Sequence, residues 1–222
     1  MDKPSDPGET FFIVFGISLT VVIVGALVFS IVYYVRNPLP PSSPSSPSSL
    51  ELFLPLSGSE PEYEPEKWNS DPILQKNHNC YAYVLDDLIS GRENKPQPGT
   101  WSNTDNDANE AQKYSSCPVM LGRIMADNNS IYPVQETEPC RKGFYKGYLT
   151  LHPGKDYHFY RQDSNGYFSH KRGKLAVEDT DAARNKIEVP RLAVKHYGDY
   201  SYIDSCGYFC IPNNKTKQTN SI

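Results

Sequence analysis

The sequence predicts an α+β domain behind an N-terminal transmembrane segment. The run from Phe11 to Val35 is uncharged and dense in Val, Ile, Leu and Phe. Apolar residues then recur at helical spacing from Cys80 to Ile89, whereas the second half of the chain alternates in the manner of strands. A helical part followed by antiparallel strands is typical of the α+β class.

The composition excludes several other classes of protein. Of the 222 residues, 38% are hydrophobic and 22% are charged, which is unlike a disordered chain, a coiled coil or a collagen-like fibre. Acidic residues outnumber basic ones by 26 to 22, and the net charge is −4. Because a nucleic-acid backbone needs a basic surface, we expect no nucleic-acid partner.

The apolar run at residues 11–35 predicts a transmembrane helix, preceded by a short tail at residues 1–10. At about 1.5 Å per residue, a helix of this length exceeds the roughly 30 Å hydrocarbon core of a bilayer. Tyr33, Tyr34 and Arg36 are typical of an interfacial anchor. A cleaved signal peptide is the alternative, but the run is too long and its start is acidic. We therefore expect a single-pass membrane protein with the lipid bilayer as a partner.

The side of the membrane on which the C-terminal part lies stays open. Lys3 and Arg36 flank the span, and the position of Arg36 favours a cytoplasmic C-terminal domain. Sequons at Asn128 and Asn214 favour the opposite, lumenal side, where the chain would be a glycoprotein.

A tether is predicted over residues 36–67. Its Pro/Ser tract (Pro38 to Ser49) cannot bury a core, and its acidic stretch (Glu60 to Glu66) is typical of a solvated spacer. The soluble domain then covers residues 68–212, followed by a C-terminal tail at residues 213–222. A domain of this size can bury a hydrophobic core without disulfides.

Helices are expected in the first half of this domain. Asn79 is a good N-cap for the helix from Cys80 to Ile89, and Gly91 is a plausible C-cap. A second helix is expected around Asp107 to Tyr114, and a third is expected to start near Val119.

Strands are expected in the second half, starting with Gly143 to Leu151. Pro153-Gly154 marks a turn, after which Tyr157 to Gln162 pairs with Tyr167 to Lys171. A last strand is expected near Tyr200 to Tyr202 or Tyr208 to Ile211.

Three residues are candidates for chemistry: Cys80, His158 and His170. Cys80 is expected in the first turn of its helix, where free N–H groups and the helix dipole favour a thiolate. A thiolate is a nucleophile, and it needs a histidine within hydrogen-bond reach as base and acid. His158 and His170 fall on neighbouring predicted strands.

The length of the loop between these strands decides whether the two histidines meet. An odd loop, such as Ser164-Asn165-Gly166, places His158 opposite or diagonal to His170 on one face of the sheet. A two-residue Asn165-Gly166 turn would place them on opposite faces.

The order of these residues resembles that of NlpC-type papain-like peptidases. The motif Asn79-Cys80-x-x-Tyr83 opens a helix, and Asp156-Tyr157-His158-Phe159-Tyr160 follows on a strand before the second histidine. The phrase DYHFYRQDSNGYFSHKRG also resembles uncharacterised papain-like proteins of bacteria and large DNA viruses. The resemblance covers roughly residues 77–212, without the anchor and tether.

The resemblance implies a papain-like domain in which Cys80 is the nucleophile, His158 the base and His170 the orienting group. Bacterial members of the family cut amide bonds in peptidoglycan stem peptides, and relatives of the lecithin-retinol acyltransferase type transfer acyl chains. The family usually has an acid before its cysteine, where this chain has Asn79.

Each candidate also has a purely structural interpretation. A lone cysteine in an apolar helix is usually a packing residue, and a histidine between aromatic residues is usually a satisfied core group. His78 is expected to be exposed to solvent. The remaining polar residues have weaker claims: Tyr157 and Arg161 as substrate contacts, and Asp199 and Asp204 as loop caps.

The other four cysteines permit two disulfides if the domain lies on an oxidising side. They are Cys117, Cys140, Cys206 and Cys210, and the sequence leaves their three connectivities open. A metal site formed by Cys206, Cys210 and His196 is an alternative, but its spacing is weak and a fourth ligand is missing.

Three functions follow from these patterns. The leading hypothesis is a membrane-anchored thiol hydrolase, an amidase or peptidase without metal or cofactor, that cleaves an unspecified peptide or acyl-amide substrate through Cys80, His158 and His170. The second is a catalytically silent, membrane-displayed binding or structural protein, such as a virion component. The third is a lipid acyltransferase.

Overall fold

The computed structural model describes residues 53–89, 95–105 and 116–213. Four helices precede most of the strands in this part of the chain, as the predicted α+β class requires. The helices are α2 (Glu66–Asn69), α3 (Pro72–Asn77), α4 (Cys80–Val84) and α6 (Cys117–Asp127). The strands are β1 (Tyr132–Val134), β2 (Phe144–His152), β3 (Asp156–Gln162), β4 (Phe168–Lys171), β5 (Val177–Glu178), β6 (His196–Tyr197), β7 (Tyr200–Ser201) and β8 (Asp204–Pro212).

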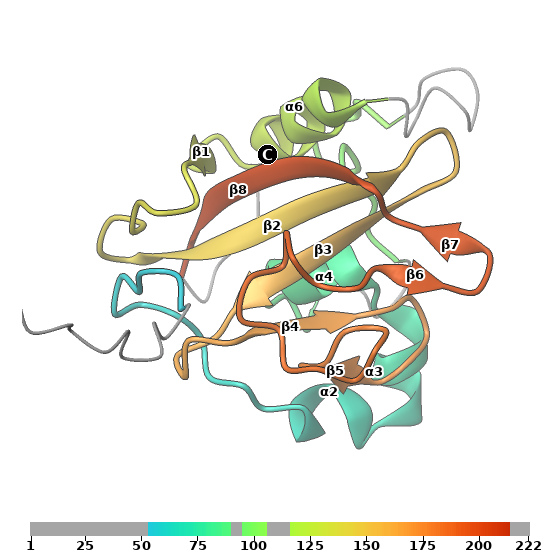
Figure 1. The fold of residues 1–222 in the computed structure, drawn as a ribbon. Coiled ribbons are helices and arrows are strands. Elements are labelled where there is room, and N and C mark those ends of the chain that lie inside the picture. Colours follow the sequence, from blue (N-terminus) through green and yellow to red (C-terminus); the bar gives the residue numbers. More distant parts are fainter. Residues whose placement is uncertain (1–52, 90–94, 106–115, 214–222) are drawn as a thin grey trace, which may run out of the picture. The chain divides into compact units, whose positions relative to one another are not determined.

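Six strands form one antiparallel sheet in the order β1-β8-β2-β3-β4-β5 (Figure 1). The predicted strands correspond to β2, β3 and β4, and the two proposed positions for the last strand fall in β7 and β8. A separate two-stranded hairpin joins β6 to β7. The sheet is therefore the frame on which the C-terminal half of the domain is built.

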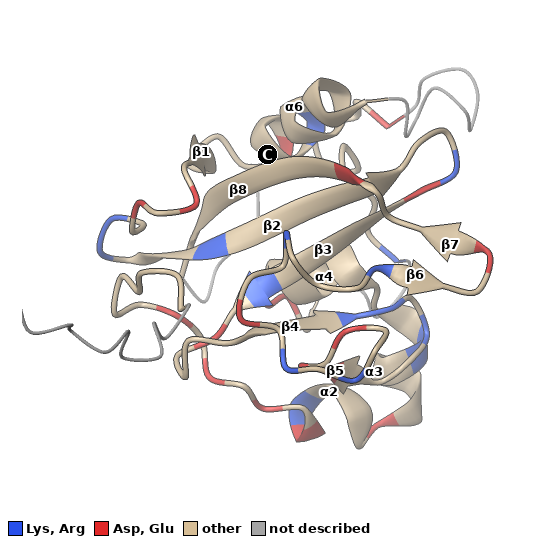
Figure 2. Ribbon diagram, in the orientation of Figure 1, with Lys and Arg blue, Asp and Glu red and all other residues tan. Residues whose placement is uncertain are grey.

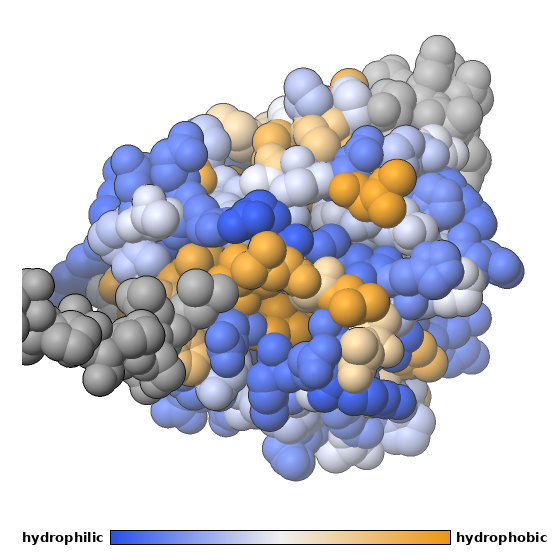
Figure 3. All heavy atoms as spheres, viewed as in Figure 1, coloured by the Kyte–Doolittle hydropathy of each residue, from blue (hydrophilic) through white to orange (hydrophobic). Residues whose placement is uncertain are grey.

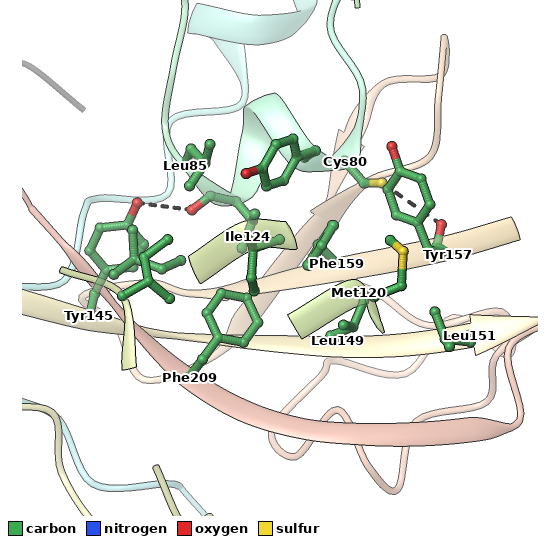
Figure 4. Packing of buried hydrophobic residues seen from close by; sticks show 14 residues of the cluster. Cys80, Leu85, Met120, Ile124, Tyr145, Leu149, Leu151, Tyr157, Phe159 and Phe209 are labelled. Atoms are coloured by element: carbon green, nitrogen blue, oxygen red, sulfur yellow. Dashed lines mark hydrogen bonds between the residues drawn. The ribbon is translucent and has the colours of Figure 1, made fainter. Parts of the chain in front are cut away.

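Helices α4 and α6 cover one face of the sheet. Alternate residues of β2 and β3 point toward these helices, as expected for strands with one face on a core. In this cluster Tyr81 packs against Phe159 with ring centroids 5.4 Å apart, and Tyr145 donates a hydrogen bond to the Val84 carbonyl (Figure 4). Its largest side chains come from α4, α6, β2, β3 and β8.

The opposite face of the sheet has a core of its own. Tyr148, Tyr160 and Phe168 point to this side, and Ile187 and Val189 cover them from the segment after β5. The face of the molecule seen in Figure 3 is mostly hydrophilic, and hydrophobic side chains gather near its centre.

Helix α4 is shorter than the predicted helix, which was expected to reach Ile89. It ends at Val84, with Leu85 as its C-cap, because Asp86 takes a left-handed conformation with φ of 53°. The Asp86 carboxylate is held by the guanidinium of Arg161, 3.0 Å away on β3. A tertiary ion pair therefore fixes the helix end.

The predicted tether is wrong for residues 53–67, which pack on the domain. Leu54 is buried, and its carbonyl accepts a hydrogen bond from the Gln162 side chain at 2.9 Å. The carbonyl of Glu62 accepts one from Arg161, and that of Pro61 accepts one from Ser164. The domain thus begins before residue 68 and includes the acidic stretch.

Several predictions lie outside the described residues. These are the apolar run at residues 11–35, the Pro/Ser tract, the helix expected around residues 107–114, and the sequon at Asn214. Within the described ranges, no helix has the length and apolar character needed to cross a membrane.

Two disulfides link other parts of the domain to β8. Cys117, at the start of α6, is bonded to Cys206 of β8, and Cys140 is bonded to Cys210 of the same strand. The alternative metal site of Cys206, Cys210 and His196 is therefore wrong, because both sulfurs are already in covalent bonds. No group of three or more potential metal-binding side chains occurs in the described part of the chain.

Candidate functional site

Cys80 is the first residue of α4, as predicted. The Asn79 side chain caps the helix by accepting a hydrogen bond from the Ala82 N–H at 3.0 Å, and its amide donates to the Pro96 carbonyl at 2.7 Å. An asparagine at this position therefore supplies the cap that fixes Cys80 at the start of the helix.

The Cys80 thiol is buried and neutral. Its residue is only 6% exposed, and the sulfur donates a hydrogen bond to the Tyr157 carbonyl at 3.9 Å (Figure 4). Desolvation, and then the nearby carboxylate of Asp156, raise the pKa of the thiol to about 12. Burial therefore overrides the helix N-terminus, which would favour a thiolate.

The hairpin register brings His158 and His170 to one face of the sheet. Tyr160 lies opposite His170, so His158 is the diagonal neighbour of His170. The Asp163 N–H donates to the Tyr167 carbonyl, which leaves the odd loop Ser164-Asn165-Gly166. Of the two loop lengths that the sequence left open, the structure has the odd one.

The hydrogen bonds of the two imidazoles fix their tautomers. His170 Nε2 lies 3.0 Å from the Thr180 carbonyl, which can only accept, so this nitrogen carries the proton. His170 Nδ1 is then the acceptor for His158 Nε2, 2.7 Å away. The remaining nitrogen of a neutral His158, Nδ1, therefore has a lone pair.

Burial keeps both imidazoles neutral near pH 7. Desolvation lowers the pKa of His170 to about 4, and it lowers the pKa of His158 well below its ordinary value, helped by the His170 charge. The two imidazole rings lie under the segment that contains β6 and β7. The ring centroids of His158 and Tyr202 are 5.2 Å apart, and those of His170 and Tyr197 are 6.0 Å apart. A protonated imidazole at this position would lose its hydration.

Cys80 and His158 line a common cavity of about 160 Å³. Asp156 and Tyr202 also line it, and the Tyr202 hydroxyl donates to the Asp156 carboxylate at 2.8 Å. Sequence reasoning gave neither residue a role in the site. The sequence feature that could have indicated Tyr202 is the tyrosine-rich segment from His196 to Tyr202, whose tyrosines cover the imidazoles.

The structure thus assembles the three candidates without a thiol–imidazole hydrogen bond. Among the described residues, the sulfur's hydrogen-bond partner is a backbone carbonyl, and the bond of His158 goes to His170. The thiol and the neutral imidazole face one cavity. All three groups are uncharged in this arrangement, and within the described ranges the thiol has no imidazole hydrogen-bonded to it that would activate it as a nucleophile.

The minor candidates have mainly structural surroundings. His78 is fully buried, which corrects the expectation of exposure, and its ring lies 5.6 Å from that of Trp68. Arg161 is also buried, where it pairs with Asp86 and Asp163 on the side of the sheet that faces α4. Asp204 begins β8, so it is not a loop cap.

Comparison with known proteins gives one informative similarity. The chain is 34% identical over 142 residues to insoluble matrix shell protein 1 of Ruditapes philippinarum, which covers 63% of this chain and 83% of the relative. No family model matches the chain, and no solved structure matches it.

This similarity corrects the classification expected from the sequence. The relative is named as an insoluble matrix shell protein, whereas the sequence suggested a membrane-anchored thiol hydrolase. The terms hydrolase, thiol protease and single-pass membrane protein are therefore withdrawn for this chain.

Proposed function

We propose that this chain, which belongs to the same family as insoluble matrix shell protein 1, is a non-enzymatic structural component of an insoluble matrix. The observation that carries the proposal is the extent of the similarity, 34% identity over 83% of the relative. This proposal corresponds to the second hypothesis from the sequence, a catalytically silent structural protein. It differs in that the protein is located in a matrix and not on a membrane.

The two disulfides support a role outside a reducing compartment. Disulfides persist where the surroundings are oxidising, and they are rare in the cytosol. Cys117–Cys206 and Cys140–Cys210 both end on β8, a central strand of the sheet. They attach α6 and the segment before β2 to this strand, which suits a domain that must last in a matrix.

The environment of Cys80 supports the absence of catalysis. A reactive cysteine needs a thiolate at neutral pH, and a pKa of about 12 leaves almost none. The catalytic roles of Cys80, His158 and His170 stay predictions. In the structural role proposed here, the thiol packs at the edge of the core and the imidazoles tie β3 to β4.

The finer assignment of the fold is part of the same proposal. We place the domain in a papain-like arrangement, supported by the order of its parts. A helix that begins with the cysteine precedes antiparallel strands that bear the first and second histidines. A structural protein of this type would keep the scaffold of an enzyme without its activity.

Fractionation tests the proposed function. An antibody against residues 53–213 is used on tissue that expresses the chain, after sequential extraction with buffer, detergent and denaturant. We expect the chain in the residue that denaturant does not dissolve. Recovery in the detergent extract would contradict the proposal and would indicate a membrane protein.

A matched variant tests whether Cys80 takes part in incorporation into the matrix. Cys80→Ala removes the sulfur and leaves a side chain that the helix accepts. We expect this variant to enter the insoluble fraction to the same extent as the wild type. Loss of incorporation by a folded Cys80→Ala protein would show that the thiol takes part in assembly.

A further inference from the structure

A second cavity, about 330 Å³ in volume, adjoins the one at Cys80. We call it the tyrosine groove, and its lining includes Asp156, Arg172, Leu175, Tyr197, Tyr200 and Tyr202. It shares Asp156 and Tyr202 with the Cys80 cavity. The two cavities are therefore neighbours, with Tyr202 between the Cys80 cavity and the β6–β7 hairpin residues of the groove.

The tyrosines of the groove form a fixed platform. The rings of Tyr200 and Tyr202 are nearly parallel, with an interplanar angle of 15° and centroids 6.3 Å apart. Tyr202 is held by its hydrogen bond to Asp156 and by its contact with the His158 ring. Tyr200 is 42% exposed. The platform is therefore formed before any ligand arrives, which lowers the entropy cost of binding.

Cations surround this platform. The Arg172 guanidinium lies over the Tyr197 ring at 4.4 Å, and the Lys155 ammonium lies over the Tyr200 ring at 4.7 Å. Lys95 lines the adjoining cavity. Figure 2 shows a basic residue in the turn between β2 and β3, which contains Lys155. The buried Lys171 of β4 is not available to a ligand, because its ammonium donates to three backbone carbonyls. In a chain with a net charge of −4, the cations around the platform are a local concentration of positive charge.

The acidic groups near the groove are already engaged. The Asp156 oxygens accept hydrogen bonds from the Tyr157 N–H and the Tyr202 hydroxyl, each at 2.8 Å. Glu178 accepts from Arg172 at 2.8 Å. Glu178 thus neutralises Arg172, whereas the donors to Asp156 are uncharged and leave its negative charge in place. Lys155 and Lys95 are the cations that would attract an anion to the rim.

We propose that the tyrosine groove binds an anionic sugar chain, one that bears carboxylate or sulfate groups. The C–H faces of sugar rings stack on the electron-rich faces of tyrosine rings, and the rim cations pair with the acidic groups. An acidic peptide fits less well, because Leu175 is the one aliphatic side chain among the seven residues that line the groove and offers no pocket for a second apolar side chain. Binding of this kind does not depend on incorporation into a matrix.

The binding test uses the purified full chain and four immobilised polymers at low salt. Alginate carries carboxylates, heparin carries sulfates in addition to carboxylates, dextran is neutral, and polyglutamate is an acidic peptide. We expect retention on alginate or heparin and release from both as salt is raised. Retention on heparin alone would identify sulfate as the group that is recognised. Dextran and polyglutamate should retain the chain at least fivefold less.

Variants separate stacking from simple charge attraction. Tyr200→Ala should weaken the apparent affinity about fivefold to tenfold, and Tyr200→Phe should restore it because the ring face remains. Lys155→Gln should also weaken binding, whereas Lys142→Gln, a charge loss at an exposed position outside the groove, should not. Circular dichroism and thermal melting confirm that each variant is folded.

Three results would overturn the proposal. One is an absence of retention on both alginate and heparin. Another is retention on polyglutamate equal to or above that on the sugars, which would indicate an acidic peptide ligand. The third is equal binding by wild type, folded Tyr200→Ala and folded Lys155→Gln, which would show that retention reflects the overall charge of the protein and not the groove. Each is independent of the fractionation result, so failure of the groove and failure of the matrix role are distinguishable.

Discussion

His158 donates a hydrogen bond from Nε2 to Nδ1 of His170, 2.7 Å away, and both rings are buried under tyrosines. His170 Nδ1 can accept because the ring proton of His170 is on Nε2, which donates to the Thr180 carbonyl. This bond needs a neutral His170, because a protonated Nδ1 has no lone pair with which to accept. Acid should therefore weaken the domain through these two residues.

The first prediction concerns stability at low pH. The pKa of His170 is lowered from its ordinary 6.5 to about 4, so the unfolded chain takes up the proton first as pH falls. The stabilisation is fully present above pH 6.5 and is lost between pH 6.5 and 4, by about 3 kcal/mol for His170 alone. His158 acts in the same direction. Denaturant unfolding at a series of pH values measures this loss.

The His170→Asn variant is the control for this experiment. Asparagine keeps an acceptor near His158 but does not titrate, so the variant should lose less free energy of unfolding between pH 7 and 4. Carboxylates titrate in both proteins and cancel in the comparison. Parallel pH profiles for variant and wild type would contradict a neutral, buried His170.

The second prediction concerns the reactivity of Cys80. With a pKa of about 12, the folded chain should react with iodoacetamide at pH 8 about a thousandfold more slowly than an unfolded thiol. Cys80 is the free cysteine of the described residues, so mass spectrometry should find one label after unfolding in denaturant. Cys80→Ala should take up none. Rapid labelling of the folded protein at pH 7 would show a thiolate and contradict the non-enzymatic role.

The third prediction concerns Asp127, the last residue of α6. Its buried carboxylate accepts hydrogen bonds from the backbone N–H groups of Gly99, Trp101 and Ser102, and from the Tyr81 hydroxyl. Asp127→Ala leaves these donors unpaired, and we expect a loss of about 3–5 kcal/mol in the free energy of unfolding.

Hydrogen exchange locates this effect. In Asp127→Ala, protection should fall first at residues 99–102, because these amides lose their acceptor. Glu138→Ala, a change at an exposed carboxylate, should alter stability by no more than about 0.5 kcal/mol. Unchanged protection at residues 99–102 would mean that water or other groups replace the carboxylate.

The parts of the fold that follow from local sequence were predictable. The turn residues around Gly166, which has φ of 89°, set the register that joins His158 to His170. Asn79 likewise marks the start of α4 through a cap within three residues. In both places the decisive contacts lie close together along the chain. The sequence therefore predicted the Asn79 cap and limited the hairpin to two possible loop lengths.

Features that depend on distant contacts were not predictable. Asp86, whose left-handed conformation ends α4, forms an ion pair with Arg161 on β3. Residues 53–67 are held on the domain by hydrogen bonds such as that from Gln162 to Leu54. Two tertiary effects keep the Cys80 thiol protonated. The packing of α4 against β3 buries the thiol, and the negative charge of Asp156 raises its pKa further. The order of cysteine and histidines indicates where the residues meet, but their charge states are set by the tertiary environment.

The fourth prediction concerns the disulfides, whose removal should destabilise the domain unequally. Cys140–Cys210 and Cys117–Cys206 span 70 and 89 residues, so loop entropy alone assigns each about 4–5 kcal/mol. Cys210 is fully buried, whereas Cys206 is partly exposed. Replacing the first pair by alanine therefore also leaves a void beside β8, and it should cost more free energy than replacing the second pair. Thermal melts of the two double variants measure the order, and an equal or reversed order would show that burial at Cys210 contributes little.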